Sequence, residues 1–159
     1  MFSEKWDLRF IKMARMVSTW SKDPSTQTGA VLVDDQRRVI SVGYNGFAPG
    51  VEDKLERYQD RYNTKYKIIL HCEENAIVFG DRDRVKGATL YTWPFRSCAK
   101  CAGLVIQAGI KTVVTKEAEH VDLTLANDPN RWEHQFVLAR TQFEEAGVNM
   151  VFYPKDIFK

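Results

Sequence analysis

Two short segments of the sequence combine residue types that bind a zinc ion and carry protons. His71 and Glu73 stand two residues apart, and Cys98 and Cys101 form a Cys-x-x-Cys pair further along. A catalytic zinc ion takes three protein ligands and keeps its fourth position open for water. Glu73 is not needed as a ligand and can act as the acid–base group on that water. We therefore predict one zinc ion per chain, with the ligands His71, Cys98 and Cys101.

Each segment alone is weak evidence, so two other functions stay open. A lone histidine before a helix is usually a capping or packing residue. A lone Cys-x-x-Cys pair can be redox-active, although that chemistry does not require His-x-Glu upstream. A non-catalytic zinc module would need a fourth ligand, and the remaining histidines, His120 and His134, have no ligand-like spacing.

The elements around these residues predict an α/β fold. Apolar periodicity indicates helices at residues 4–20, 72–79, 98–108 and 131–146, the last two stopped by Gly109 and Gly147. Strands are expected at 30–33, 39–44, 88–93, 111–114 and 148–152, with a long irregular loop running from Asn45 through 52–67. Strands that alternate with helices in the second half imply parallel crossovers. We expect a mixed five-stranded sheet flanked by helices in a three-layer sandwich.

This arrangement has a consequence for the metal ligands. Cys98 and Cys101 open one helix three residues apart, so their sulfur atoms fall on one face. The positive end of the helix favours their thiolate forms.

Composition is consistent with one globular domain spanning residues 1–159. The formal charge is +2, with 44% hydrophobic and 28% charged residues. No apolar run is long enough to span a bilayer, and three cysteines suit a reducing compartment, so we expect an intracellular, cytoplasmic protein without membrane partners. No basic or aromatic strip suited to a polynucleotide is present.

Several motifs, taken together, resemble the deoxycytidylate (dCMP) deaminases of the cytidine deaminase superfamily. They are Ser21-Lys22-Asp23-Pro24-Ser25-Thr26, Gly29-Ala30-Val31, Gly43-Tyr44-Asn45-Gly46, His71-Cys72-Glu73-Glu74-Asn75-Ala76-Ile77 and Ile106-Gln107-Ala108-Gly109-Ile110. His-x-Glu followed by Cys-x-x-Cys also matches the zinc deaminase signature. The resemblance implies a cytidine-deaminase-like fold and a zinc enzyme that converts dCMP to dUMP and ammonia, supplying thymidylate synthesis. It also implies a homo-oligomer, favouring a hexamer.

The sequence departs from that family at two positions. Ser97 stands where proline usually precedes the first cysteine, and serine is a good helix N-cap. Cys72 stands where alanine is common, and we expect it to point away from the metal and to pack as a small apolar residue.

The resemblance places Asn45 against the substrate sugar and base, although its Asn-Gly sequence alone would indicate a plain turn. Trp93 and Phe95 precede the cysteines and could line the pyrimidine site, with core packing as the alternative. For the substrate phosphate the candidates are Lys22, Ser25 and Thr26. Deamination of dCTP or of a cytosine nucleoside by the same groups stays open.

A regulatory site is the last expectation. The resemblance implies dCTP and dTTP effectors, with Mg²⁺ accompanying a triphosphate. The candidate residues are Gly43, Tyr44 and Gly46, together with the charged, tyrosine-bearing stretch 52–67. A solvated surface loop or a subunit interface explains that stretch equally well.

Overall fold

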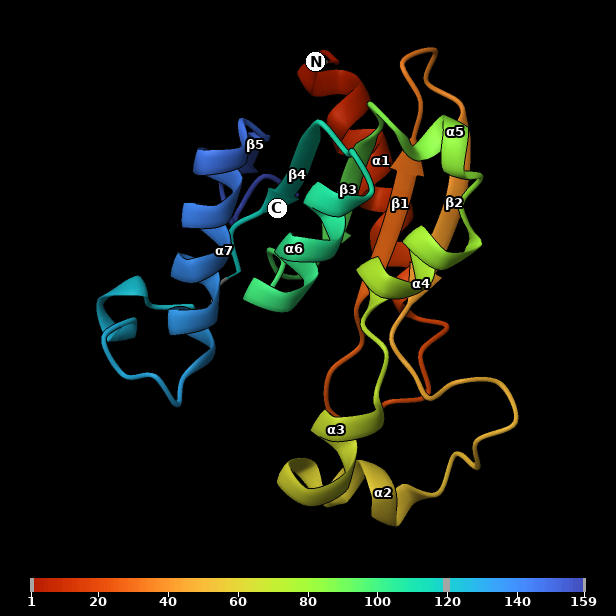
Figure 1. The fold of residues 1–159 in the computed structure, drawn as a ribbon, viewed down its shortest axis with the longest axis vertical. Coiled ribbons are helices and arrows are strands. Elements are labelled where there is room, and N and C mark those ends of the chain that lie inside the picture. Colours follow the sequence, from red (N-terminus) through yellow and green to blue (C-terminus); the bar gives the residue numbers. More distant parts are fainter. Residues whose placement is uncertain (1, 119–120, 159) are drawn as a thin grey trace.

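A mixed five-stranded sheet forms the centre of the computed structural model, which describes residues 2–118 and 121–158 (Figure 1). The strands are β1 (Gly29–Val33), β2 (Val39–Tyr44), β3 (Thr89–Trp93), β4 (Thr112–Lys116) and β5 (Asn149–Tyr153). Their order across the sheet is β2-β1-β3-β4-β5. Strand β1 pairs antiparallel with both β2 and β3. Strands β3, β4 and β5 pair parallel, as expected for strands that are joined by helical crossovers.

Helix α1 (Glu4–Ser18) covers one face of the sheet. It buries Phe10, Ile11, Ala14 and Val17 against side chains of β1, β3 and β4, among them Val31 and Tyr91. Successive residues of β1 point to opposite faces, so Val31 and Val33 face α1 whereas Ala30 and Leu32 face the other layer.

The opposite layer holds α4 (Cys72–Phe79), α6 (Ala99–Gln107) and α7 (Trp132–Ala146), with the short α5 (Arg82–Val85) beside them. Two glycines allow the helices to approach the strands closely. A Cβ on Gly29 would lie 2.1 Å from the carbonyl oxygen of Ala14 in α1, and one on Gly43 would lie 2.2 Å from that of Cys72 in α4. The predicted three-layer α/β architecture is therefore confirmed.

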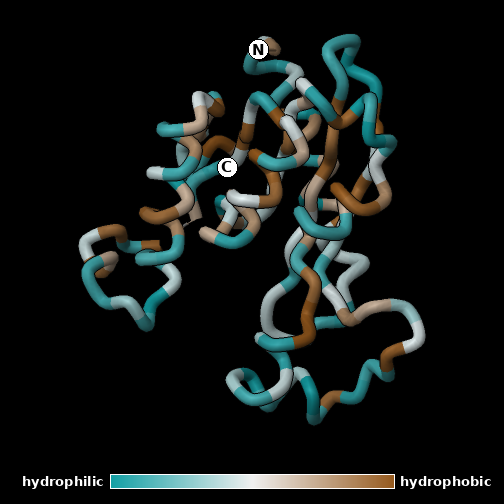
Figure 2. The backbone as a smooth tube through the Cα atoms, viewed as in Figure 1, coloured by the Kyte–Doolittle hydropathy of each residue, from teal (hydrophilic) through white to brown (hydrophobic). Residues whose placement is uncertain are grey.

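The predicted long irregular loop is the main error of the sequence analysis. The connection between β2 and α4 contains α2 (Leu55–Gln59), a π-helical turn η1 (Arg61–Lys65) and α3 (Tyr66–Ile68). Tyr58 is buried and stacks on Phe47 with 4.4 Å between the ring centroids, which anchors these helical turns. Figure 2 shows the connection as mostly hydrophilic, so apolar periodicity gave no signal of helix there.

Smaller differences concern helix ends. Helix α6 begins at Ala99 with Cys98 as its N-cap, so the predicted capping role of Ser97 is wrong. Ser97 precedes the N-cap residue and is buried. The predicted glycine stops are confirmed, because Gly109 and Gly147 follow α6 and α7 with φ of 80° and 70°. A short 3-10 turn, η2 (Leu123–Leu125), precedes α7. Among the described residues, no helix combines the length and apolar character that crossing a bilayer requires.

Candidate active site

The structure brings the three predicted metal ligands together. His71 Nδ1 lies 3.5 Å from Cys98 Sγ and 3.3 Å from Cys101 Sγ. All three donor atoms lie within 4.8 Å of one another. Tetrahedral zinc with ordinary bond lengths separates a nitrogen and a sulfur ligand by roughly 3.6 Å. The geometry and chemistry of the donor set are therefore consistent with a zinc ion.

Two helix starts present these donors. His71 is the N-cap of α4, and Cys98 is the N-cap of α6, with Cys101 in the first turn of the same helix. The carboxylate of Glu74 accepts a 2.7 Å hydrogen bond from the backbone N–H of His71, which fixes the start of α4. His134, the other described histidine, lies against the carbonyl oxygen of Ala126, and His120 lies outside the described residues.

The local electrostatics favour a thiolate at Cys98. A hydrogen bond from Cys101 and the nearby imidazole of His71 hold the pKa of the Cys98 thiol well below its ordinary value, in spite of burial. That shared hydrogen bond, together with burial, raises the pKa of Cys101 instead. A metal ion that takes both sulfurs as ligands must therefore displace a proton from Cys101.

Glu73 lies directly beside the donor set, at the start of α4, and is 5% exposed. Its Oε2 accepts a 3.2 Å hydrogen bond from the Cys72 thiol. Cys72 packs in the core with Ala30 and Leu32, as predicted, and is not one of the clustered metal donors, but it also lines the cavity, so the prediction that it points away from the metal site is wrong. The thiol turns toward the Glu73 carboxylate because both residues lie in the first turn of α4.

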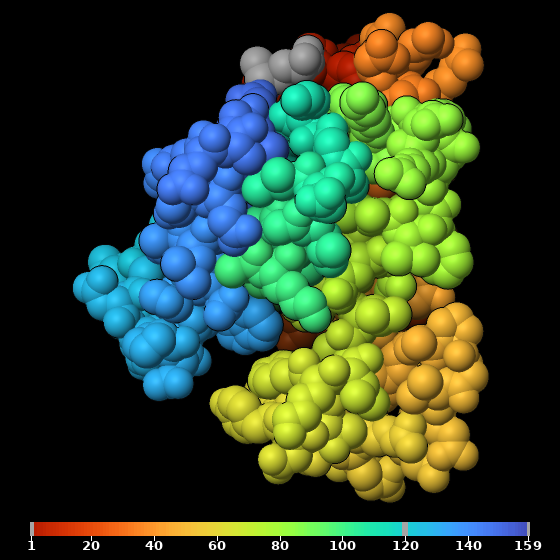
Figure 3. All heavy atoms as spheres, in the orientation of Figure 1, coloured from red at the N-terminus to blue at the C-terminus, as the bar shows by residue number. Residues whose placement is uncertain are grey.

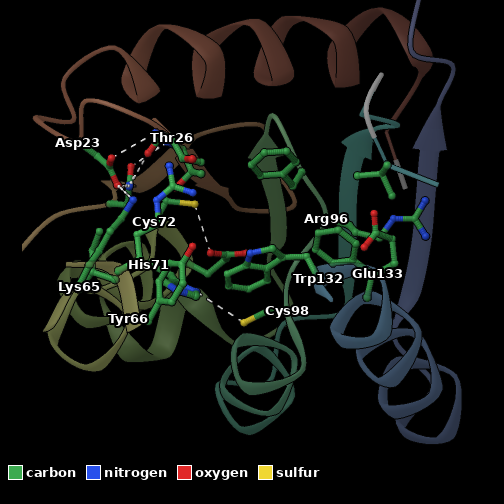
Figure 4. Close-up of a pocket in the computed structure, with 18 of the residues that line it drawn as sticks. Asp23, Thr26, Lys65, Tyr66, His71, Cys72, Arg96, Cys98, Trp132 and Glu133 are labelled. Atoms are coloured by element: carbon green, nitrogen blue, oxygen red, sulfur yellow. Dashed lines mark hydrogen bonds and ion pairs between the residues drawn. The ribbon is translucent and has the colours of Figure 1, made fainter. Parts of the chain in front are cut away.

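A cavity of about 480 Å³ opens over these residues. Figure 3 shows a hollow between the segment 55–68 and the segment that leads into α7. His71, Glu73 and Cys98 line the cavity floor, as the close-up in Figure 4 shows for two of them. The volume falls within the range of small-molecule sites, about 300–1,000 Å³.

Some of the predicted substrate residues line this cavity and others do not. Asn45, Thr26, Trp93 and Phe95 contribute to its lining. Asn45 is buried, and its side chain accepts a hydrogen bond from the Thr28 N–H and donates one to the carbonyl oxygen of Thr26. The Asn45-Gly46 segment is thus held by hydrogen bonds to the loop before β1 and is not a plain surface turn.

The two other phosphate candidates lie outside the lining. Lys22 is 72% exposed and pairs with Asp53 at 2.8 Å. Ser25 donates its hydroxyl to Asp23 and accepts a hydrogen bond from Lys65. The charged groups that line the cavity from these two segments, the loop before β1 and the connection between β2 and α4, are instead Asp23, Arg61 and Lys65.

The three effector candidates have different surroundings. Gly43 lies beneath α4, where the helix backbone leaves no room for a Cβ, so its smallness serves packing. Tyr44 is 42% exposed and meets Trp20 edge to face, and Gly46 pairs with Leu70 through two backbone hydrogen bonds. The effector site itself stays a prediction.

Several cavity residues were either missed by the sequence analysis or placed only in the candidate regulatory stretch 52–67. They come from the helical connection after β2, from the strand-to-helix turn at β3 and from the start of α7: Arg61, Lys65, Tyr66, Arg96, Arg131, Trp132, Glu133 and Phe136. Trp132 meets Tyr66 edge to face at 5.9 Å and lies 6.3 Å from the His71 ring, measured between centroids. Trp132 is the first residue of α7, and no local motif distinguished it from an ordinary helix start.

A histidine and two cysteines beside a buried carboxylate outside the donor set, on a mixed sheet with helices on both faces, define the class of zinc-dependent deaminases. Residues 4–117 match the family model described as the cytidine and deoxycytidylate deaminase zinc-binding region. The chain belongs to this family, whose members are deaminase-type hydrolases.

Relatives of the whole chain support this assignment. An uncharacterized deaminase from the luxG 3′ region of Aliivibrio fischeri is 40% identical over 155 residues, which cover 98% of each chain. Deoxycytidylate deaminases of Mus musculus and Homo sapiens are 34% and 33% identical, over 95% of this chain and 82% of theirs.

A solved structure shows the same fold. The dCMP deaminase of cyanophage S-TIM5, crystallised with dCMP and dUMP, superposes with a TM-score of 0.72. The match covers 96% of this chain and all of that chain, at 19% identity.

Proposed function

We propose that this protein is a dCMP deaminase, which hydrolyses dCMP to dUMP and ammonia. The observation that carries the proposal is one cavity lined by two of the three clustered metal donors, His71 and Cys98, and by the buried carboxylate of Glu73. The similarity of the whole chain to deoxycytidylate deaminases supports dCMP over other cytosine compounds.

Glu73 is the catalytic acid–base residue in this proposal. Zinc, when bound to His71, Cys98 and Cys101, lowers the pKa of a water molecule so that hydroxide is available near neutral pH. Glu73 takes a proton from the attacking water and gives it to N3 of the ring. The second proton passes through the same carboxylate to the exocyclic amine, and the C4–N bond breaks to release ammonia while C4–O becomes the new carbonyl.

The rest of the cavity suits a nucleoside monophosphate. Aromatic side chains of Trp93, Phe95, Phe136 and Trp132 offer surfaces for a pyrimidine ring. The phosphate cannot be held by Lys22 without movement of that side chain, since it is exposed and paired with Asp53. Cationic side chains of the lining are better placed, and Arg61 is the one that we propose for the phosphate.

Regulation and assembly extend the proposal. By analogy with regulated dCMP deaminases, we expect a homohexamer in which dCTP with Mg²⁺ activates and dTTP inhibits, through a site at Gly43, Tyr44 and Gly46. A triphosphate acts there only if it binds one conformation of the oligomer more tightly than another. Initial rates over a range of dCMP concentrations, with and without each triphosphate, test this.

The experiment that tests the proposed activity is an ammonia-release assay with zinc-loaded protein on dCMP, dCTP, CMP, deoxycytidine and cytosine. We expect the highest kcat/KM for dCMP. Equal efficiency on deoxycytidine would make the protein a nucleoside deaminase, and preference for dCTP would make it a triphosphate deaminase. Absence of turnover on every compound, with zinc bound, would contradict a catalytic role.

A further inference from the structure

Two ion pairs cross between the same two segments on one side of the cavity. The segments are the loop before β1 and the helical connection between β2 and α4. Lys22 of the loop pairs with Asp53 of the connection at 2.8 Å, while the next loop residue, Asp23, pairs with Lys65 of the connection at 2.7 Å. The two pairs differ in burial, because the side chains of Lys65 and Asp23 are only 5% and 0% exposed.

The Asp23 carboxylate organises the loop that lines the cavity. Its Oδ1 accepts hydrogen bonds from the backbone N–H groups of Ser25 and Thr26 and from the Ser25 hydroxyl. Its Oδ2 contacts Lys65 Nζ and, at 3.3 Å, the Asn45 amide nitrogen. The cation and these donors lower the pKa of Asp23 although burial opposes this, so the carboxylate is ionised at neutral pH.

Lys65 reaches this carboxylate from the end of the π-helical turn η1. Its backbone N–H bonds the carbonyl oxygen of Asp60, five residues earlier, and its Nζ also donates to the Ser25 hydroxyl at 3.0 Å. The next residue is Tyr66, whose ring meets Trp132 across the cavity. Figure 4 shows Lys65 and Tyr66 together on this side, with Asp23 and Thr26 above Lys65.

From these contacts we infer that Lys65 is a positioning residue, which acts through the buried Asp23 pair to hold the substrate-facing loop and the helical connection against each other. Removal of one partner leaves the other charge buried without compensation. The loop carrying Thr26 and the Asn45 amide would then lose its common anchor, and Tyr66 would lose its fixed position opposite Trp132. The inference rests on the proposed function only for the choice of substrate.

The test compares Lys65→Met with Asp53→Asn, which weakens the exposed ion pair between the same two segments. Displacement of substrate-positioning groups by about 1 Å can cost about 10²-fold in rate, so kcat/KM of Lys65→Met should fall by about 10²-fold on whichever compound the wild type prefers. Asp53→Asn should stay within about threefold, because exposed pairs contribute little. Both variants should keep their zinc.

Two further measurements separate positioning from general stability. Chymotrypsin should cleave native Lys65→Met faster at Tyr62 and Tyr66 than the wild type, with Asp53→Asn unchanged. The double variant Asp23→Asn/Lys65→Met should lose no more kcat/KM than the worse single variant, since both act through one contact. Any one of three results would overturn the inference. The kcat/KM of Lys65→Met could stay within threefold of wild type, or its rate of proteolysis could be unchanged. In the double variant, the loss of kcat/KM could equal the product of the two single losses. Failure of the wild type to deaminate dCMP would instead concern the proposed function.

Discussion

At the residue scale, the arrangement around Glu73 leads to a direct prediction. Glu73→Gln removes the proposed proton carrier but keeps the size and burial of the side chain, so zinc binding and folding should persist. Placed acids and bases contribute about 10²–10⁴-fold in rate, and a group that serves several transfers should lie at or above the top of that range. Turnover of Glu73→Gln, measured with zinc content, checks this. Glu145→Gln, on the exposed face of α7, is the control, and near-normal turnover of Glu73→Gln would indicate another acid.

The metal ligands give a second prediction at this scale. Cys101→Ala removes one of three donors, so the purified protein should fall from about one zinc per chain to a small fraction of that, as measured by elemental analysis. Cys72→Ala is the matched control, because Cys72 lies next to His71 but outside the donor cluster, and it should retain zinc. Full zinc retention in Cys101→Ala would exclude the assigned ligand set.

At the element scale, a buried carboxylate connects α1 to the sheet. Asp7 of α1 is 2% exposed and accepts hydrogen bonds from the hydroxyl groups of Tyr91 at 2.6 Å and Tyr153 at 2.8 Å. Burial and the Asp7 carboxylate raise the pKa values of both tyrosines, so both stay protonated donors at neutral pH. These bonds attach one helix to β3 and β5 at once.

Tyr91→Phe should therefore lower the free energy of unfolding by about 1.5–3 kcal/mol, the range for hydrogen bonds to charged groups. Urea denaturation with an unchanged m-value measures the loss. Tyr62→Phe is the control, since Tyr62 is 80% exposed, and it should leave the midpoint unchanged. A loss below 0.5 kcal/mol in Tyr91→Phe would show that water replaces the phenol at Asp7.

The elements also show what the sequence could predict. Each of the five strands and the four longer helices was placed within one or two residues, because apolar periodicity and glycine stops reflect local physics. The donor set was predictable, since its spacing follows from two helix starts. The helical connection after β2 was not, because its helices are held by a few contacts such as Phe47 on Tyr58 rather than by an apolar face. Trp132 was missed, and Lys65 was placed only in the regulatory stretch, because their partners are distant in sequence.

At the scale of the whole molecule, charge around the cavity predicts how the substrate is selected. Arg61 and Arg57 lie one turn apart on the same connection, but only Arg61 lines the cavity, whereas Arg57 contacts Glu52. A charge-assisted contact to phosphate contributes about 1.5–3 kcal/mol. Arg61→Gln should thus reduce kcat/KM for dCMP by about 10- to 100-fold and that for deoxycytidine much less. Arg57→Gln should leave the ratio of kcat/KM for dCMP to that for deoxycytidine unchanged. If Arg61→Gln also left this ratio unchanged, Arg61 would not be part of the phosphate site.

The division of the cavity between two parts of the chain has an evolutionary consequence. The metal donors and Glu73 lie within residues 4–117, which the family model spans, while Trp132, Glu133 and Phe136 reach the same cavity from beyond that region. Trp132, Glu133 and Phe136 can thus change without altering the metal donors or Glu73, whereas Asn45, Arg61 and Phe95 lie in the same stretch of sequence as those groups. Drift in residues 130–136 would therefore reshape one wall of the cavity while the metal donors and Glu73 stay unchanged, and exchange of that stretch between homologues is a corresponding route for engineering.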